Sequence, residues 1–316
     1  MKPLVSVIIP YYNRPEKLQR ALTSVMQQTH KNIEVLVVDD ASTIPPQGLE
    51  AFPKVQLLKN KKNSGPGVSR NTGMQKANGS YLAFLDCDDY WAPQFLESCL
   101  QQFENTKEPL LFVYANSYTV KEDVNTGLRH LQIVDTQQVI PDIFKNRRPW
   151  CTSACLWHQS LLGTQRWLPT RSWEDYAFDT EAAVRCNKVG VVKEPLVYYE
   201  EGGADKLSDQ AKDKTETQKA PSIIHISKTL RNSTFIEQPF LRHKLKALLL
   251  ARIIFKLRNG EENMGESELF QEYVIHSKKW KNSFIRILLK TNPIGAIKFL
   301  EKQKINASKK ADQYLA

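Results

Sequence analysis

The sequence predicts an α/β protein in which a mostly parallel, Rossmann-like sheet is flanked by helices and followed by an α-helical C-terminal region. Over the first hundred residues, short β-branched and aliphatic runs alternate with segments of helical periodicity. Several of these runs end in a polar cluster, as strands do at the ligand-binding edge of an open sheet. Beyond about residue 210 only helical periodicity remains. With 316 residues, 41% of them hydrophobic, the chain can bury one large core or two modest ones.

The first third of the chain alternates strands with helices. Residues 4–9 (LVSVII) form a β-rich apolar run that Pro10 ends, and residues 15–28 then repeat apolar side chains at helical spacing. The pattern continues with predicted strands at 33–40, 55–60 and 81–86 and predicted helices near 67–77 and from Pro93 onward. Because strands separated by helices run parallel, helices are expected on both faces of the sheet.

The rest of the chain is less regular and then becomes helical. Strands are predicted at 110–118, 128–134 and 150–157, a helix at 174–187, and two short strands at 189–201 around Pro195. Farther on, segments 241–258 and 281–301 place apolar residues on one face and Lys or Arg on the other. The preferred interpretation is that these helices pack on the N-terminal domain, and membrane contact is the alternative.

The positive charge lies in the C-terminal third. The formal net charge is +10, yet residues 206–316 hold 22 Lys and Arg against 11 Asp and Glu, while residues 1–205 are almost neutral. We therefore predict a globular domain over residues 1–208 and a basic helical region over residues 209–316. A basic surface attracts anions, so nucleic acid, acidic lipid and acidic glycan are candidate partners at this level.

Neither a membrane span nor secretion is expected. The longest aliphatic stretch, residues 247–255, is interrupted by Arg252 and is shorter than the roughly 18 to 20 apolar residues of a spanning helix. The N-terminus lacks the small residues of a signal-peptide cleavage site, so a cytoplasmic location is expected. The five cysteines form no CxxC pair and have no histidine at zinc-site spacing, so they are predicted to be free thiols.

Two acidic clusters follow predicted strands: Asp39-Asp40, and Asp86 with Asp88 and Asp89. Because the carboxyl ends of parallel strands meet at one edge, these carboxylates should share a crevice, where their repulsion requires a cation. A small set of oxygen ligands favours Mg²⁺ or Mn²⁺, completed by water and substrate phosphates, whereas zinc prefers His or Cys. One such Asp alone would more simply be a helix N-cap, but the two clusters together favour a metal.

The residues in these segments carry a family resemblance. The run VSVIIPYYNRPEKLQRALTSVMQQTHKNIEVLVVDDAS and the later NSGPGVSRNTGMQKANGSYLAFLDCDD resemble the nucleotide-sugar half of a family-2 glycosyltransferase with the GT-A fold. The resemblance covers roughly residues 3–100 and continues more weakly in residues 172–186 and 196–203. It implies a nucleotide-sugar-binding half at 1–100, an acceptor-binding half at 101–208, and an inverting, metal-dependent transfer of a sugar.

The resemblance implies that two groups of residues surround the nucleoside base. Pro10, Tyr12 and Asn13 follow the first strand, and Asp40, with Asp39 beside it, follows the second. An Asp at this place can accept a hydrogen bond from a uracil N3–H.

The same resemblance assigns the rest of the donor site. Arg70 and Asn71 would face the nucleotide and the donor sugar, Asp86 would lie near the ribose, and Asp88, with Asp86, would hold the Mg²⁺ or Mn²⁺ that bridges the diphosphate. Alternatives remain open: Arg70 as a surface charge on its helix, and Asp89 as a helix cap or a further metal contact.

The pair Glu174-Asp175 is similar to the Glu-Asp motif of this family. A nucleoside diphosphate leaves with its charge stabilised by metal, so the remaining task is to deprotonate the attacking hydroxyl. The resemblance gives this general-base role to Asp175, beside Glu174, and in-line attack then inverts the anomeric centre. The alternative is a charged first turn favoured by the helix dipole. Trp173 and Trp150 are candidates for an aromatic wall against a sugar ring, with core packing as the alternative.

The sequence departs from the family pattern in two places. No QxxRW motif follows Glu174-Asp175, which argues against a processive, membrane-embedded synthase. The closing loop over residues 200–208 lacks the expected histidine or basic residue at the diphosphate, and Lys206 is the candidate substitute.

The expected partners are a nucleotide sugar, with a UDP-sugar preferred, and a glycan or lipid-linked glycan acceptor. An anionic membrane surface at the inner face of the cell membrane and a second copy of the chain are further candidates. Nucleic acid is not expected, because aromatic residues do not interleave with the C-terminal basic ones. A sugar nucleotidyltransferase is the enzymatic alternative, but residues 10–14 supply no Gly-rich phosphate loop. The non-catalytic alternative is a basic membrane or nucleic-acid adaptor.

Overall fold

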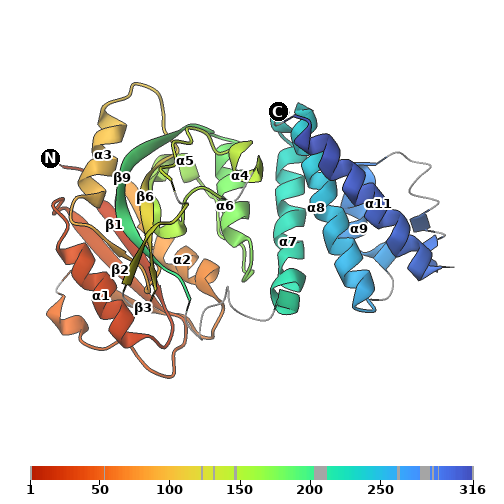
Figure 1. The fold of residues 1–316 in the computed structure, drawn as a ribbon. Helices are drawn as coiled ribbons and strands as arrows, with labels where there is room; N and C mark the ends of the chain where they lie inside the picture. Colours follow the sequence, from red (N-terminus) through yellow and green to blue (C-terminus); the bar gives the residue numbers. More distant parts are fainter. Residues whose placement is uncertain are drawn as a thin grey trace. The chain divides into compact units, whose positions relative to one another are not determined.

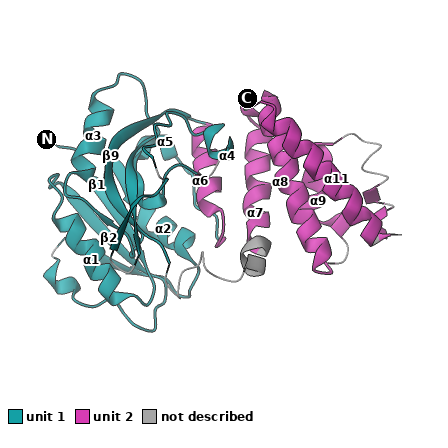
Figure 2. Ribbon diagram, viewed as in Figure 1, with its two compact units in different colours: residues 1–169, 185–206 teal, residues 170–184, 207–316 magenta. Residues whose placement is uncertain are grey.

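The computed structural model divides the chain into two compact units (Figure 2). It describes residues 2–52, 54–121, 124–130, 132–145, 148–202, 212–261, 264–277, 285–286, 288–290 and 292–314. Unit 1 comprises Met1–Pro169 and Arg185–Lys206, and unit 2 comprises Thr170–Val184 and Leu207–Ala316. The main division thus falls close to the domain boundary predicted after residue 208, but the segment Thr170–Val184 clusters with the C-terminal helices.

Unit 1 is built on one sheet with the strand order β3-β2-β1-β4-β8-β6-β9-β5, and β7 pairs with β6. Its strands are β1 (Val5–Tyr11), β2 (Ile33–Asp39), β3 (Val55–Lys59), β4 (Tyr81–Phe84), β5 (Tyr90–Trp91), β6 (Phe112–Lys121), β7 (Val124–Leu128), β8 (Cys155–His158) and β9 (Val189–Glu200). The first four are parallel, β8 runs antiparallel between β4 and β6, and β6 and β9 are again parallel. Figure 1 labels β1, β2, β3, β6 and β9 of this sheet. The predicted mixed α/β fold with a mostly parallel sheet is confirmed.

Helices cover both faces of this sheet, as predicted. They are α1 (Pro15–Met26), α2 (Pro66–Met74) and α3 (Phe95–Glu104), with the short α4 (Asp142–Lys145) and α5 (Gln159–Leu162). Alternate residues of β1, such as Val7 and Ile9, share a core with the apolar faces of α1 and α3. The opposite face receives α2, where a Cβ on Gly73 would lie 2.4 Å from Ile8 Cγ2, so only glycine allows α2 to pack this closely.

Two predicted strands take a different form in the structure. The strand predicted at 128–134 is replaced by β7, because side chains satisfy the next backbone donors: Asn116 Oδ1 accepts from Val134 N (2.7 Å) and Tyr114 Oη accepts from Thr136 N (2.8 Å). The two short strands predicted around Pro195 are one strand, β9. Pro195 lies opposite a register shift at Asn116, where a missing N–H costs no ladder hydrogen bond.

Unit 2 is helical, with its own apolar core. Its helices are α6 (Glu174–Ala183), α7 (Lys212–Arg231), α8 (Pro239–Arg258), α9 (Glu268–Ile275) and α11 (Pro293–Asp312). The predicted amphipathic helix at 241–258 is confirmed as α8, and its apolar residues are buried against the other helices. The helix predicted over 281–301 falls partly outside the described residues, and α11 begins at Pro293, where Asn292 caps it through Gly295 N (2.8 Å). No helix in the described part of the chain is long and apolar enough to cross a bilayer.

Candidate active site

The acidic residues predicted for the site lie at the ends of β2 and β4, the two strands that flank β1. In the register of the sheet, Tyr11 pairs with Asp39, and Ile8 pairs with Phe84, two residues before Asp86. The carboxyl ends of β2, β1 and β4 therefore bring the two acidic clusters to one edge of unit 1, as expected. Tyr12 follows β1 at this edge with 45% of its surface exposed.

Asp39 and Asp40 are both buried, but their carboxylates have different surroundings. Asp40 accepts hydrogen bonds from Asn60 Nδ2 (2.8 Å), from Ser64 N (3.0 Å to each oxygen) and from Gly65 N (2.7 Å). Asp40 thus fixes the loop that leads into α2. Asp39 accepts only from Ser42 N (2.9 Å to Oδ1) among the described residues. Of the two, Asp39 has an oxygen left for a ligand.

Side-chain hydrogen bonds connect the turn after β1 to the loop after β2. Asn13 has a positive φ of 53°, which Asn tolerates better than most residues, and its Oδ1 accepts from Ile44 N (2.9 Å) and Thr43 Oγ1 (3.2 Å). Tyr11 is buried and donates from its hydroxyl to Ile44 O (2.8 Å); burial raises its pKa to about 12. Asn13 therefore holds the loop after β2 in place at the base site.

Arg70 and Asn71 on α2 both reach Trp167, which lies far away in the sequence. Arg70 lies over the Trp167 ring, 4.4 Å from its centroid, and donates to Asp86 Oδ1 (2.6 Å). The Asn71 side chain donates to Trp167 O and accepts from Trp167 N, each at 2.8 Å. Arg70 therefore packs on the Trp167 ring and pairs with Asp86, the carboxylate predicted to lie near the ribose. Asn71 connects the backbone of Trp167 to α2.

Asp88 and Asp89 differ in role although they are adjacent. Asp88 Oδ2 accepts from Arg14 (2.9 Å). Asp89 is fully buried and accepts from Ser153 Oγ (2.5 Å) and Glu200 N (3.0 Å); burial, reinforced by the charges of Asp88 and Asp86, raises its pKa well above the ordinary value. Asp89 therefore ties β9 to the segment that follows β4.

Glu200, at the end of β9, joins the site to α1. Its carboxylate pairs with Lys17 and Arg20, and Arg20 also donates to Asp88 O (2.7 Å). Burial alone would raise the pKa of Glu200, but the hydrogen bonds from Lys17 and Arg20 outweigh it and lower the pKa below its ordinary value. The rest of the closing loop, including Lys206, lies outside the described residues.

The carboxylates of Asp86 and Asp88 are the candidate ligands for Mg²⁺ or Mn²⁺. They are oxygen donors on one strand end, and each already faces a guanidinium, that of Arg70 or of Arg14. Within the described ranges, no group of three or more His, Cys, Asp or Glu side chains is placed to hold a metal ion. This donor set fits a metal that takes its remaining ligands from water and a diphosphate, not an all-protein cage.

Glu174 and Asp175 form the first turn of α6 in unit 2. The preceding Trp173 has a φ of 62°, a left-handed conformation that is unusual for a bulky residue, and its ring stacks on Tyr176 at 4.6 Å. Asp175 Oδ1 accepts from Tyr176 N (2.8 Å). Both carboxylates lie in the first turn of the helix, at the positive end of its dipole.

Trp150, considered above as an aromatic wall, is a core residue. It is buried in unit 1 and packs against Phe112 and Tyr114. Trp173, in contrast, is only partly buried. Of the two candidates for stacking on a sugar, the structure leaves Trp173.

Several site residues had no role in the sequence reading: Arg14, Lys17, Arg20, Trp167 and Glu200. Arg14 lies 74 residues from Asp88 and Trp167 lies 96 from Asn71, so no local pattern joins them. The sequence offers one signal for these residues, the position of Arg14 next to the turn YYN of the predicted base site.

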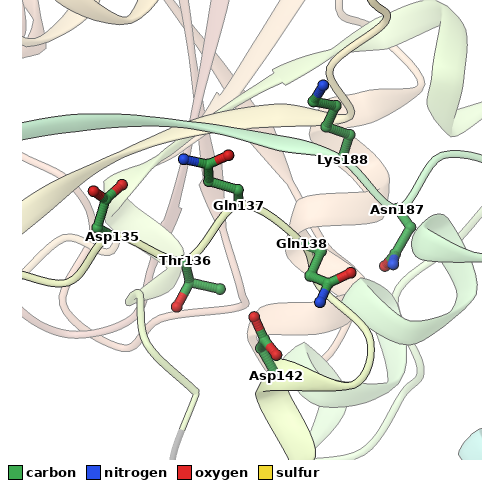
Figure 3. A pocket seen from close by; sticks show the side chains of 7 residues that line it. All are labelled: Asp135, Thr136, Gln137, Gln138, Asp142, Asn187 and Lys188. Atoms are coloured by element: carbon green, nitrogen blue, oxygen red, sulfur yellow. The ribbon is translucent and has the colours of Figure 1, made fainter.

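A polar cavity of about 640 Å³ lies elsewhere in unit 1 (Figure 3). Its lining residues are Asp135, Thr136, Gln137, Gln138, Asp142, Asn187 and Lys188. Lys188 immediately precedes the amino end of β9, which runs parallel to β6 and hence to β4 and β1. The cavity therefore lies toward the amino ends of these strands and away from the acidic edge.

An open, mostly parallel sheet with an acidic edge at the carboxyl ends of its strands places the chain among the α/β proteins that bind ligands at this edge. Residues 6–168 match Glycosyl transferase family 2, and the chain belongs to this family. A glycosyltransferase of Haemophilus influenzae is 31% identical over 241 residues, which cover 73% of this chain and 79% of that protein. The UDP-Glc:alpha-D-GlcNAc-diphosphoundecaprenol beta-1,3-glucosyltransferase WfaP of Escherichia coli is 35% identical over 130 residues, covering 40% and 50% of the two chains.

Solved structures agree on the fold. The crystal structure of S. aureus TarS 1–349 in complex with UDP-GlcNAc superposes with a TM-score of 0.63 at 19% identity, covering 98% of this chain and 91% of that one. Against three glycosyltransferases of Rickettsia species, which are 28%, 31% and 35% identical, the chain spans 44%, 35% and 20% of the relatives' lengths.

Proposed function

We propose that the chain transfers a sugar from a UDP-sugar to a lipid-linked glycan acceptor with inversion at the anomeric carbon. The observation that carries the proposal is the acidic edge of unit 1, where Asp39, Asp86 and Asp88 lie at the ends of β2 and β4, the parallel strands on either side of β1 in a family-2 domain. UDP is favoured as the nucleotide because TarS, which shares the fold, was crystallised with UDP and with UDP-GlcNAc.

Asp39 is the candidate that recognises the base. A uracil N3–H needs one acceptor, and Asp39 keeps an oxygen that no described residue occupies, whereas Asp40 is saturated by Asn60, Ser64 and Gly65. The exposed Tyr12 ring at the same edge offers a surface on which a base can stack.

Two arginines and two carboxylates form the diphosphate side of the site. Asp86 and Asp88 would hold a Mg²⁺ or Mn²⁺ ion, which would supply positive charge for the departing diphosphate. Arg14 and Arg70 hold these carboxylates in place and add two fixed cations beside them. An arginine fork also matches phosphate oxygens, so both guanidiniums are suited to contact the donor.

Asp175 is the candidate general base. Its carboxylate takes the proton from the acceptor hydroxyl while that oxygen forms a bond to the anomeric carbon. The bond from this carbon to the diphosphate oxygen breaks, and its electron pair leaves with UDP. Attack from the face opposite the leaving group inverts the configuration. Glu174 lies beside Asp175 in the first turn of α6 and takes no proton in this step. Trp173 and Tyr176 offer a stacked aromatic surface for an acceptor sugar.

The lipid-linked acceptor is proposed from a relative. WfaP is named for a diphosphoundecaprenol-linked acceptor, and a second relative, TuaG of Bacillus subtilis, is named as a putative teichuronic acid biosynthesis glycosyltransferase.

A donor screen followed by an acceptor assay tests the function. The protein is incubated with UDP-glucose, UDP-GlcNAc, UDP-galactose and GDP-mannose in turn, with Mn²⁺, and with a synthetic GlcNAc-diphosphoundecaprenol acceptor, and UDP or GDP release and the lipid product are measured. We expect one UDP-sugar to give a product that depends on the acceptor. Release of pyrophosphate from UTP and a sugar phosphate would instead identify a nucleotidyltransferase, and no turnover with any donor would remove the enzymatic proposal.

A further inference from the structure

One face of α11 combines exposed isoleucines with lysines. Ile294, Lys298, Lys302, Ile305 and Lys309 follow one another at steps of four, four, three and four residues, the spacing that keeps side chains on one side of a helix. All five are exposed, and the isoleucines expose 69% and 53% of their surfaces. These five residues are called the α11 stripe below.

The α11 stripe is not needed for the core of unit 2. The core face of α11 is supplied by other residues, of which Ala296, Leu300, Ala307 and Ala311 are buried. Single exposed isoleucines are common on protein surfaces, but two on one face, interleaved with three lysines, are a less ordinary pattern.

The three lysines of the stripe carry uncompensated charge. Lys298, Lys302 and Lys309 form no ion pair with any residue that the structure describes, whereas other cations of unit 2, such as Lys228 and Lys256, pair with glutamates. Two acidic residues lie near the stripe on α11. Glu301 is paired with Arg258, which leaves Asp312 at the end of the helix as one negative charge against three positive ones.

The apolar side chains of α8, unlike the two isoleucines of the α11 stripe, are buried or half-buried. Although α8 is more basic than α11, its Leu245, Leu249 and Ile253 are fully buried in unit 2, so it has no apolar side chains of this kind to offer a membrane. The membrane contact considered for both amphipathic segments therefore has its best candidate in α11.

We propose that the α11 stripe docks the protein on a bilayer that contains acidic phospholipid. Phosphate headgroups match the lysines, and the shallow hydrocarbon boundary accepts the isoleucines while the lysine stems extend toward the headgroups. A nucleic acid offers phosphates but no apolar layer for Ile294 and Ile305. The same face of a second copy would bring like charges together. A bilayer is the partner that satisfies both kinds of side chain.

Vesicle co-sedimentation of the full chain, without donor or acceptor, tests this proposal independently of glycosyl transfer. The wild type is mixed with vesicles of phosphatidylglycerol and phosphatidylcholine, or of phosphatidylcholine alone, at low and high salt. We expect binding to the acidic vesicles at low salt, weakened by salt because the attraction is screened. The triple variant Lys298→Gln, Lys302→Gln, Lys309→Gln should bind about a hundredfold more weakly, since each lysine near an acidic surface adds roughly a factor of five.

Matched variants separate position from total charge. Lys76→Gln, Lys107→Gln, Lys304→Gln removes three exposed lysines outside the stripe and should bind like the wild type. Ile294→Gln, Ile305→Gln should weaken binding several-fold at unchanged net charge, whereas Ile275→Gln, at another exposed isoleucine of unit 2, should not. Circular dichroism and thermal unfolding confirm that each variant is folded.

Three results would overturn the proposal. Equal binding of the two triple lysine variants would show that overall charge and not the stripe drives association. Equally tight binding of soluble polyphosphate, unaffected by Ile294→Gln, Ile305→Gln, would show an electrostatic site with no bilayer preference. A concentration-dependent dimer in light scattering that the stripe variants abolish would assign the face to a second copy.

Discussion

At the scale of single residues, adjacent carboxylates in this chain have different hydrogen-bond partners and therefore different roles. Asp39 and Asp40 follow the same strand, as do Asp88 and Asp89, yet in each pair one side chain is committed to the surrounding backbone and one faces the site. Asp40 and Asp89 accept hydrogen bonds from backbone N–H groups, and their loss would leave buried donors unsatisfied.

We therefore predict opposite effects for two neighbouring substitutions. Asp39→Ala should weaken UDP binding about ten- to a hundredfold, the contribution of a hydrogen bond to a charged acceptor, and should lower the free energy of unfolding by less than Asp40→Ala does, because only Ser42 N loses its acceptor. Asp40→Ala should lower that free energy by about 1 to 3 kcal/mol, because Ser64 N and Gly65 N lose their acceptor. Calorimetric titration with UDP and urea denaturation measure the two quantities. A stable Asp40→Ala protein that no longer binds UDP would return the base contact to Asp40.

The roles of Glu174 and Asp175 are separable by kinetics. Asp175→Asn should lower kcat by about a hundred- to ten-thousandfold, the usual cost of removing a general base, while the KM for the donor stays near that of the wild type. Glu174→Gln should lower kcat by a smaller factor, because Glu174 does not take the proton from the acceptor. If Glu174→Gln is inactive and Asp175→Asn retains most of its turnover, the two roles are reversed.

The sequence predicts the acidic residues of the site but not their partners. Asp39, Asp86 and Asp88 are identifiable because each follows an apolar run that reads as a strand. Arg14 and Trp167 are not, since their contacts with Asp88 and Asn71 depend on tertiary packing across 74 and 96 residues. Asn71 was expected to face the donor because it lies in a recognisable segment. In the structure, the oxygen and the nitrogen of its side-chain amide both bind the backbone of Trp167.

At the scale of elements, the link between α1 and β9 closes the site from one side. Glu200 at the end of β9 pairs with Lys17 and Arg20 of α1, and this pairing lowers the pKa of Glu200. A lowered pKa means that the folded state favours the carboxylate. The link therefore contributes its full stability above the unfolded-state value of 4.5 and loses it as the pH falls through the lower folded-state value.

Glu200→Gln tests this link, with Glu201→Gln as the matched control. At pH 7 the first change should lower the free energy of unfolding by about 1 to 3 kcal/mol, because it leaves Lys17 and Arg20 without their buried partner. Glu201 is exposed and lies 4.0 Å from Lys121, so its replacement should have almost no effect. Urea denaturation at pH 7 and at lower pH measures the difference, which should shrink below pH 4.5. A difference that is constant with pH would show that shape and not charge matters at this position.

The order of elements was largely predictable, and the exceptions have physical causes. Apolar runs located β1, β2 and β4 within a few residues, because these strands are largely buried, and the apolar residues of the partly exposed β3 located that strand as well. Pro195 misled the pattern, since proline normally interrupts a strand, but a register shift at Asn116 accommodates it here. Such a shift is set by the neighbouring strand and leaves no local trace.

At the scale of the whole molecule, the chain has two cores with different chemistry. One is formed by strands and helices of unit 1 and the other by the helices of unit 2. The near-neutral part of the chain carries the acidic site, and the last third carries the excess of positive charge. The sequence pattern does not predict that Thr170–Val184, which contains Glu174 and Asp175, clusters with the C-terminal helices.

Two cores should give two thermal transitions, and UDP should affect one of them. A ligand that binds only the folded state stabilises it by about 2.7 kcal/mol when present at a hundred times its dissociation constant. The proposed nucleotide residues Asp39, Asp86 and Asp88 all lie in unit 1, so UDP with Mn²⁺ should raise the transition of that unit in differential scanning calorimetry and leave the transition of unit 2 in place. Asp86 and Asp88 place two carboxylates, paired with Arg70 and Arg14, beside the proposed diphosphate, so we expect the diphosphate to need the metal to bind among them. EDTA, or Asp88→Asn, should then remove the shift, while Asp142→Asn, at an acid in the polar cavity away from this edge, should preserve it. A shift that survives both EDTA and Asp88→Asn would mean that the two arginines hold the diphosphate without a metal, and a shift of the helical transition instead would place the nucleotide outside the acidic edge.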